Sequence, residues 1–195
     1  MRKLKLQVQI SVDGNIAGPN GEMDWMTWNW DDKLKTYVQE LTEPVDTILL
    51  GRKMAGGFIS HWSNVKTNPD DPDFPFGKKM IDTPKVVFSK TLNKSDPVAI
   101  TWENTVIANG DLVEEINKLK NQNGKDIIVY GGASFDSALI KAGLIDEFHL
   151  FVNPALTGDG MTIFRTIEGK QKLTLIKSTS FDCGIVVLCY KPNGN

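Results

Sequence analysis

The sequence predicts an α/β protein with a mixed sheet, in which a parallel part ends in an antiparallel edge. Strand patterns alternate with helical patterns along most of the chain, and two strand patterns follow one another directly at the C-terminal end. Hydrophobic residues make up 41% of the 195 residues and charged residues 24%, which is enough apolar material for a substantial core. No linker divides the chain, so we expect a single domain spanning residues 1–195.

The first elements are a strand, a helix and a second strand. Residues 3–14, KLKLQVQISVDG, alternate polar with aliphatic residues up to an Asp-Gly turn, which is the period of a strand. Residues 31–44, DDKLKTYVQELTEP, have an apolar helical face, aspartates to cap its start and a proline to end it. Residues 45–54, VDTILLGRKM, are apolar almost throughout, which indicates a strand buried on both faces. Residues 55–83 predict one helical turn and then a loop rich in proline and aspartate.

The second half supplies more strands than helices. Short strands are predicted within residues 84–92 and 100–110, and residues 111–125 predict a helix that an aspartate caps and a glycine ends. Residues 126–143, DIIVYGGASFDSALIKAG, begin as a buried strand, pass through two adjacent glycines and end as a helix. The remaining strands are predicted within residues 144–156, 172–181 and 184–192, and the last two form a terminal hairpin around Asp-Cys-Gly.

The charge and cysteine content exclude several classes of protein. The net charge is −2 and the lysines are spread along the chain, so we expect no binding to nucleic acid or to an anionic membrane. Cys183 and Cys189 stand six residues apart in a strand pattern, and we expect two free thiols on one face of that strand. No apolar stretch could span a bilayer, and the first residues do not form the apolar block of a signal peptide. We therefore expect a cytoplasmic protein.

Three predicted strands end in residues suited to phosphate. Gly51 to Lys53 end the strand in ILLGRKM, Ser89 and Lys90 end the strand in VVFSKTL, and Gly131 to Ser134 end the strand in VYGGASF. Ligands of open α/β sheets bind beyond the carboxyl ends of the strands, and the amides at a helix start donate to phosphate. Each strand end alone also fits an ordinary turn. Together they favour a cofactor that carries phosphate.

Several common catalytic motifs are absent from the sequence. It contains neither the full G-x-G-x-x-G dinucleotide fingerprint nor a P-loop. The G-x-S-x-G elbow and H-E-x-x-H are missing too, which excludes triad and zinc hydrolysis. The two histidines, His61 and His149, and the two cysteines have no metal-ligand spacing, so we expect no metal site.

Three aspartates stand among tryptophans near the start of the first predicted helix: Asp24, Asp31 and Asp32. A carboxyl group among indole rings can have its pKa raised by desolvation, which suits it to donate a proton. The other interpretation of Asp31 and Asp32 is that they cap the helix.

Four stretches in this order resemble the dihydrofolate reductase-like superfamily: ISVDGNIAGPNGEMDW, TILLGRKM, PKVVFSKTL and IIVYGGASFDSALIKAGLIDEFHLFVNPALTGDGMTIF. The branch most similar to the chain is the reductase (RibD C-terminal) domain of bifunctional riboflavin-biosynthesis proteins. The resemblance implies a three-layer α/β/α fold around a mainly parallel sheet with a C-terminal antiparallel hairpin. It also implies NADPH as the cofactor and, commonly in this family, a cis peptide within the glycine pair. The implied cofactor contacts are Gly51, Arg52 and Lys53 at the adenine-side phosphates, Ser89 and Lys90 near the 2′-phosphate, Gly131, Gly132, Ala133, Ser134 and Phe135 at the pyrophosphate and nicotinamide, and Ile16 and Ala17 over the nicotinamide.

The resemblance implies an NADPH-dependent reductase that passes a hydride to a C=N or C=O bond of a small heterocyclic or sugar-like substrate. The reaction would be similar to that of 5-amino-6-(5-phosphoribosylamino)uracil reductase in riboflavin biosynthesis, with the proton supplied by Asp32, Asp31, Asp24 or ordered water. The chain lacks the zinc-binding pattern of the deaminase domain that accompanies this reductase in bifunctional proteins. Two alternatives stay open, a dihydrofolate reductase and a nucleotide-binding protein without turnover. Relatives also imply a homodimer formed through EFHLFV and the terminal hairpin.

Overall fold

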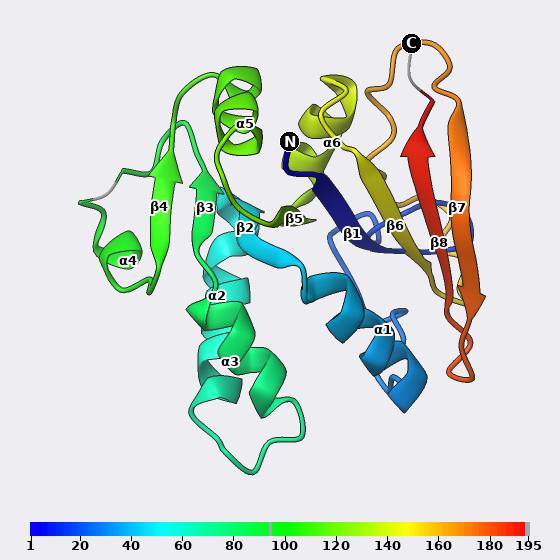
Figure 1. Ribbon diagram of the computed structural model, residues 1–195. Coiled ribbons are helices and arrows are strands. Elements are labelled where there is room, and N and C mark those ends of the chain that lie inside the picture. The colour runs from blue at the N-terminus through cyan, green and yellow to red at the C-terminus, as the bar shows by residue number, and fades with distance from the viewer. Residues whose placement is uncertain (94, 194–195) are drawn as a thin grey trace.

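The computed structural model describes residues 1–93 and 95–193, and an eight-stranded mixed sheet forms its centre (Figure 1). The strand order is β4-β3-β2-β5-β1-β6-β8-β7. Strands β1 to β6 are joined in parallel, and β8 runs antiparallel to both β6 and β7. The predicted mixed sheet with its C-terminal antiparallel hairpin is therefore confirmed. The strands are β1 Leu4–Ile10, β2 Val45–Gly51, β3 Lys85–Phe88, β4 Thr105–Ala108, β5 Asp126–Gly131, β6 Glu147–Val152, β7 Leu173–Ser180 and β8 Val186–Pro192.

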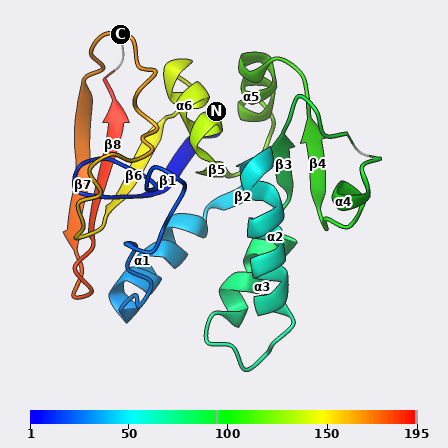
Figure 2. The same ribbon diagram turned by 180° about the vertical axis from the view of Figure 1, so that it is seen from behind.

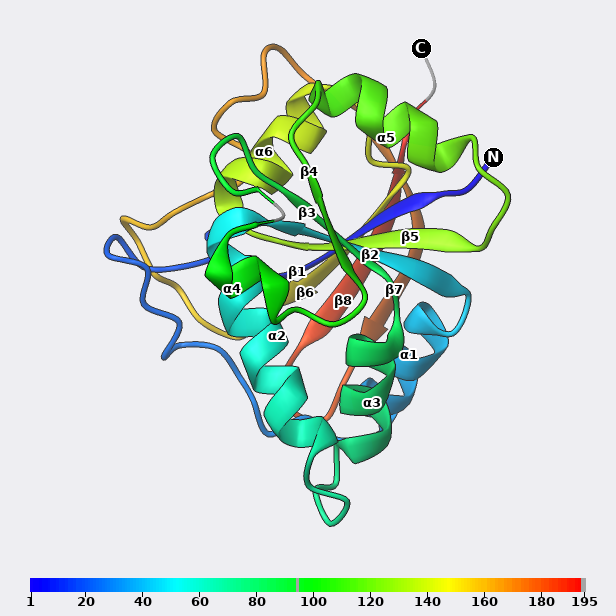
Figure 3. The ribbon, with the colours of Figure 1, turned by 90° about the vertical axis from the view of Figure 1, so that its left-hand side faces the viewer.

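Helices cover both faces of this sheet, which confirms the predicted three layers. Helices α1, α2 and α3 lie on one face and α5 and α6 on the other (Figures 1, 2 and 3). No helix in the described part of the chain has the length and apolar character needed to cross a membrane. The helices are α1 Asp32–Thr42, α2 Arg52–Lys66, α3 Phe74–Asp82, α4 Pro97–Ile100, α5 Leu112–Lys120 and α6 Ala133–Lys141.

The alternation predicted for β1 is observed, and its two faces differ in chemistry. Leu4, Leu6, Val8 and Ile10 pack into the apolar core beneath α5 and α6. The opposite face carries polar residues that are buried as well, since Lys5 and Gln7 are 7% and 8% exposed. This polar strip runs through the middle of the sheet on the side of α1.

The helical turn predicted at the start of residues 55–83 lies within α2, but the loop predicted to follow it was wrong, because the segment forms most of α2 and all of α3. Glycines and prolines made it resemble a loop, but packing between the two helices outweighs these local signals. Gly77 in α3 lets the helices approach, since a Cβ there would lie 2.6 Å from Cγ1 of Val65. The rings of Trp62 and Phe76 also meet edge to face, with centroids 5.1 Å apart.

The terminal hairpin differs from the prediction in the position of one cysteine. Both cysteines are free thiols, as predicted. Cys183, however, lies in the turn between β7 and β8, so it does not share a strand face with Cys189.

Candidate functional site

Four neighbouring parallel strands, β3, β2, β5 and β1, end at one edge of the sheet. Figure 3 shows the loop after β1 and the starts of α2 and α6 together on one side of the molecule. The three strand ends predicted from the sequence are thus brought together at the position where open α/β sheets bind ligands.

Gly51, at the end of β2, lies directly against the start of α6. A Cβ on Gly51 would be 2.9 Å from the Cβ of Phe135 and 3.1 Å from the backbone nitrogen of Gly132. The ring of Phe135 in turn stacks on Phe88 at the end of β3, with centroids 4.9 Å apart. These contacts hold the ends of β2, β3 and β5 as one packed unit.

The two glycines after β5 have different surroundings. The peptide bond between Gly131 and Gly132 is cis, as the resemblance implied. Gly131 has a φ of +120°, and a Cβ there would lie 3.1 Å from Sδ of Met54 and 3.2 Å from Oδ2 of Asp136. A Cβ on Gly132 would meet only the Cβ of Met54, at 3.9 Å. The backbone of Gly132 therefore borders open space at the sheet edge.

Two helices begin at this edge with first-turn backbone amides that no described side chain caps. Gly51 is the N-cap of α2 and Gly132 is the N-cap of α6, and neither start is capped by a side chain among the described residues. The unpaired N–H groups and the helix dipole favour an anion at such a point. Arg52 and Lys53 add exposed cations at the start of α2, and neither makes an ion pair with any residue that the structure describes. This arrangement can hold a group with two phosphates.

Asp136, in the first turn of α6, is a site residue that the sequence did not indicate. Its side chain is 1% exposed, and its Oδ1 has no hydrogen-bond partner among the described residues. Burial raises the pKa of Asp136 to about 8, so the group is mostly neutral at pH 7. A neutral Asp136 leaves the start of α6 without a negative charge. No sequence signal could reveal this, because an aspartate in the first turn of a helix normally lies on the surface.

Ser89 and Lys90 lie at the same edge but have local partners. The Ser89 hydroxyl accepts hydrogen bonds from the amides of Thr91 and Leu92, at 3.2 and 2.8 Å. The Lys90 ammonium donates to the carbonyl of Gly110 after β4, at 2.8 Å. Both residues therefore shape the loops that follow β3 and β4.

Ile16 and Ala17 belong to a loop that residues 154–161, PALTGDGM, hold in place. The Ile16 amide donates to the Met161 carbonyl at 2.7 Å, and the Met161 amide donates to the Ala17 carbonyl at 2.8 Å. A Cβ on Gly160 would lie 2.6 Å from the Ala17 oxygen, which explains the glycine there.

Asp13 also links the loop after β1 to the segment that contains Thr157 and Gly158. Its carboxylate accepts hydrogen bonds from the Ser11 hydroxyl at 2.5 Å and the Gly158 amide at 2.8 Å. The hydrogen bond from Ser11, with the amides of Gly158 and Thr157, lowers the pKa of Asp13 to about 2. The two loops are therefore joined by a charged acceptor as well as by backbone pairing.

Among the three candidate acids, Asp31 is used as a helix cap. Its two carboxylate oxygens accept from the amides of Leu34 and Cys183, each at 2.9 Å. These hydrogen bonds hold the pKa of Asp31 below its usual range, so the rise expected from nearby indoles does not occur at this residue. Asp24 and Asp32 are exposed, in the loop before α1 and at its first residue.

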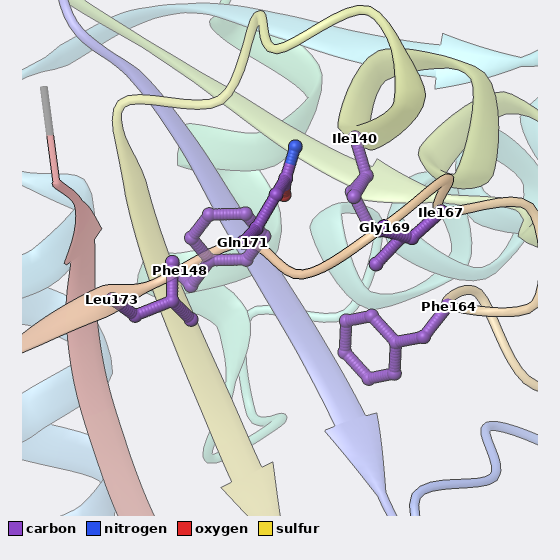
Figure 4. A pocket seen from close by; sticks show the side chains of 7 residues that line it. All are labelled: Ile140, Phe148, Phe164, Ile167, Gly169, Gln171 and Leu173. Carbon is purple, nitrogen blue, oxygen red and sulfur yellow. The ribbon is translucent and has the colours of Figure 1, made fainter. Parts of the chain in front are cut away.

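A hollow of about 340 Å³ is lined by residues other than those at the strand ends described above (Figure 4). Its lining comes from α6, β6, β7 and the segment between β6 and β7: Ile140, Phe148, Phe164, Ile167, Gly169, Gln171 and Leu173. Among the described residues, no titratable side chain lines it and no strand contributes its carboxyl end to it. The strand ends therefore remain the better candidate for chemistry.

The chain is similar to known proteins over nearly its whole length. A model of the RibD C-terminal domain family matches residues 2–187. The chain is 34% identical over 195 residues to the uncharacterized protein YyaP of Bacillus subtilis (strain 168). The matched region covers 99% of this chain and 96% of YyaP.

Two solved structures share the fold at low sequence identity. The first is a diaminohydroxyphosphoribosylaminopyrimidine deaminase/5-amino-6-(5-phosphoribosylamino)uracil reductase of Thermotoga maritima, with a TM-score of 0.69, 16% identity, and coverage of 98% of this chain and 57% of that one. The second is dihydrofolate reductase from Enterococcus faecalis complexed with NADP(H), with a TM-score of 0.57, 14% identity, and coverage of 98% and 97%. These likenesses confirm the predicted dihydrofolate reductase-like fold.

Proposed function

The chain belongs to the RibD C-terminal domain family, and from this premise we propose that it is an NADPH-dependent reductase. Its substrate is a small heterocycle or sugar-like molecule with a polarised C=N or C=O bond, of the kind that the name of the Thermotoga maritima neighbour describes. NADPH, when bound, supplies the hydride. The chain's own residues bind and orient the two reactants and keep water away from them.

One observation carries this proposal: the uncapped starts of α2 and α6 meet at the contact between Gly51 and Gly132. Two adjacent helix N-termini suit a pyrophosphate, because each one offers free amides to the phosphate oxygens. The open side of Gly132 lets a ligand approach the backbone closely. The residues at the edge therefore fit the cofactor.

Different residues at this edge would bind different parts of the cofactor. Arg52 and Lys53 would bind the adenine-side phosphates, because they are exposed and carry no partner in the described part of the chain. Ser89 and Lys90 border the place proposed for the 2′-phosphate, and their local hydrogen bonds keep that loop in shape. Ala133, Ser134 and Phe135 continue the pyrophosphate and nicotinamide contacts from the start of α6, and Ile16 and Ala17 would cover the nicotinamide.

The proton would come from ordered water or from an exposed carboxyl group at Asp32 or Asp24. Asp31 is the weakest of the three candidates, since two backbone amides stabilise its charged form. In this arrangement Asp31 would position the start of α1.

We also propose that the protein forms a homodimer through its terminal hairpin. Among the described strands, β7 pairs only with β8, so its outer edge is open. Leu173, Leu175 and Ile176 on β7 are 37%, 50% and 49% exposed. A second copy would cover these side chains and the open edge. Light scattering tests this, and a monomer mass would contradict it.

Titration of the purified protein with NADPH, followed by nucleotide fluorescence, tests the proposed function. We expect a saturable signal with NADPH and a much weaker one with NADH, and no signal with either would overturn the proposal. Turnover of dihydrofolate would favour a dihydrofolate reductase. Binding of NADPH without consumption across candidate heterocycles would favour a nucleotide-binding protein.

A further inference from the structure

The hollow beside α6 and β6 is apolar and extends from buried side chains to the surface (Figure 4). Ile140 and Phe148 in its lining are 1% and 4% exposed, whereas Leu173, at the start of β7, is 37% exposed. Its volume of about 340 Å³ lies within the range of sites for small molecules, which are mostly apolar with a few polar groups.

Two links hold one wall of the hollow, residues 163–172, against α6. The hydroxyls of Ser137 and Thr166 share a hydrogen bond at 2.7 Å. The ammonium of Lys141, near the end of α6, donates to the carboxylate of Glu168 at 2.5 Å. Because this wall is tied to a helix of the core, the hollow is a preformed space.

The same segment carries a local excess of positive charge. Arg165, Lys170 and Lys172 are exposed, and none of them makes an ion pair with a residue that the structure describes. Glu168, the one acidic residue between positions 163 and 172, is already paired with Lys141. The whole chain has a net charge of −2, so this excess is a feature of the segment and not of the surface in general.

The two lysines alternate along the chain with residues that line the hollow. Lys170 stands between Gly169 and Gln171, and Lys172 stands between Gln171 and Leu173. Each ammonium is carried on a flexible four-carbon stem, so it can bend toward a negative group at the opening. An apolar hollow with unpaired cations beside it matches a ligand that has an apolar tail and a negative head.

We propose that the hollow binds a medium-chain fatty acid. The hydrocarbon chain lies between the rings of Phe148 and Phe164, which Figure 4 shows around the same space, and the carboxylate lies beside Lys170 and Lys172. An unbranched chain suits this lining, because its torsions adapt to a wall of mixed aliphatic and aromatic side chains. The site shares no residue with the strand ends, so the inference goes beyond the proposed function and does not depend on it.

Calorimetric titration with hexanoate, octanoate and decanoate tests the apolar part of the site. Each added methylene should tighten binding by up to about 4-fold, which corresponds to ~0.8 kcal/mol per buried CH₂ group. Decanol has the same chain length without the charge, and we expect it to bind about 5-fold more weakly. Raising the salt concentration to about 0.5 M should narrow the difference between decanoate and decanol.

Two leucines of β7 provide a matched pair of variants. Leu173→Gln places an amide in the wall of the hollow and should weaken decanoate binding at least about 5-fold. Leu175→Gln is the control, since Leu175 is 50% exposed on the same strand and does not line the hollow. It should leave decanoate affinity unchanged. Both positions are partly exposed, so both variants should fold, which circular dichroism checks.

A charge reversal tests the carboxylate contact. Lys170→Glu combined with Lys172→Glu should weaken decanoate binding about 10-fold and leave decanol binding unchanged. Lys118→Glu is the control, because it makes the same change of charge at an exposed lysine of α5, outside the lining of the hollow. It should leave decanoate affinity unchanged.

Several results would overturn the fatty-acid site. They are no binding of decanoate by the wild type, equal affinities for hexanoate and decanoate, and equal decanoate affinities in the two leucine variants. Binding to phosphatidylglycerol vesicles without binding of free decanoate would indicate a membrane surface instead. Light scattering that shows a dimer lost only in Leu173→Gln, with decanoate affinity kept, would assign the hollow to a second copy of the chain.

Titration with NADPH keeps this inference apart from the proposed function. Decanoate and NADPH should bind independently, because their sites share no residue. Displacement of NADPH by decanoate would place decanoate at the strand ends and overturn the inference. Failure of the wild type to bind NADPH would reject the proposed function, while decanoate binding that depends on Leu173 and on the two lysines would still stand.

Discussion

Gly51 and Phe135 come so close that a Cβ on Gly51 would lie 2.9 Å from the Cβ of Phe135. The contact joins the end of β2 to the first turn of α6, and through the ring of Phe88 it also reaches the end of β3. The relative position of the two helix starts therefore depends on the absence of a side chain at residue 51.

Gly51→Ala should destabilise the fold by about 1–3 kcal/mol, because the obstructing atoms are a Cβ and a backbone nitrogen that cannot swing away. Gly57→Ala in α2 is the control, since a Cβ there meets nothing within 4 Å. It should stabilise the protein by roughly 0.5–1 kcal/mol through helix propensity. Urea unfolding measures both, and equal midpoints for the two variants would contradict the packing argument.

Gly132→Val should leave the fold intact and abolish NADPH binding. Residue 132 has a φ of −94°, which any residue can adopt, and a Cβ there lies 3.9 Å from its nearest neighbour. The isopropyl group would instead occupy the space beside the free amides of α6. We expect the affinity measured by nucleotide fluorescence to fall at least about 100-fold, which corresponds to about 2.7 kcal/mol.

Gly132→Ala belongs to the same series and should give a smaller loss of affinity. Circular dichroism and a melting curve must show that both variants are folded. Unchanged NADPH affinity in a folded Gly132→Val protein would mean that the glycine pair is only a turn.

Asp31→Ala should lower the midpoint of urea unfolding, because the amides of Leu34 and Cys183 both lose their acceptor. Asp31→Asn should lower it less, since an asparagine oxygen can still cap the helix. If Asp31 positions α1 and donates no proton, the pH profile of substrate reduction stays the same in Asp31→Asn. A profile that loses one ionisation in this variant would make Asp31 the proton donor.

Much of the fold could be predicted because its signals are local. Alternation revealed β1, Asp111 marked the start of α5, and the turn at residues 182–184 separated β7 from β8. Helices α2 and α3 could not be predicted, because the fit of Gly77 against Val65 joins segments that each resemble a loop alone. Local signals and tertiary packing disagreed there, and packing decided the structure.

The same distinction applies to the candidate site. The strand ends could be predicted to meet, because parallel strands direct their carboxyl ends to one edge. Asp31 accepts a hydrogen bond from the amide of Leu34, as the capping interpretation predicted, and a second one from the amide of Cys183, far away in the chain, which no sequence signal indicates. Gln7 and Asp136 are polar residues whose burial depends on the assembled layers, and a sequence pattern places such residues on the surface.

Asp136 should make the stability of the protein fall as the pH rises from about 4 to about 8. In the unfolded chain the carboxyl ionises near its ordinary pKa of 3.8, whereas in the fold it holds its proton until about pH 8. The folded state therefore binds more protons between these values, and the free energy of unfolding decreases by up to about 1.4 kcal/mol per pH unit. Above pH 8 both states are ionised and the contribution levels off.

Asp136→Asn isolates this contribution, because every other titrating group is common to both proteins. The variant should match the wild type most closely near pH 4 and gain stability relative to it at each step toward pH 8, as measured by urea unfolding. NADPH affinity should respond as well, since an ionised Asp136 at the start of α6 repels phosphate. The wild type should then bind more weakly above pH 8, while Asp136→Asn does not. Parallel stability curves for the two proteins would show that Asp136 is ionised in the fold.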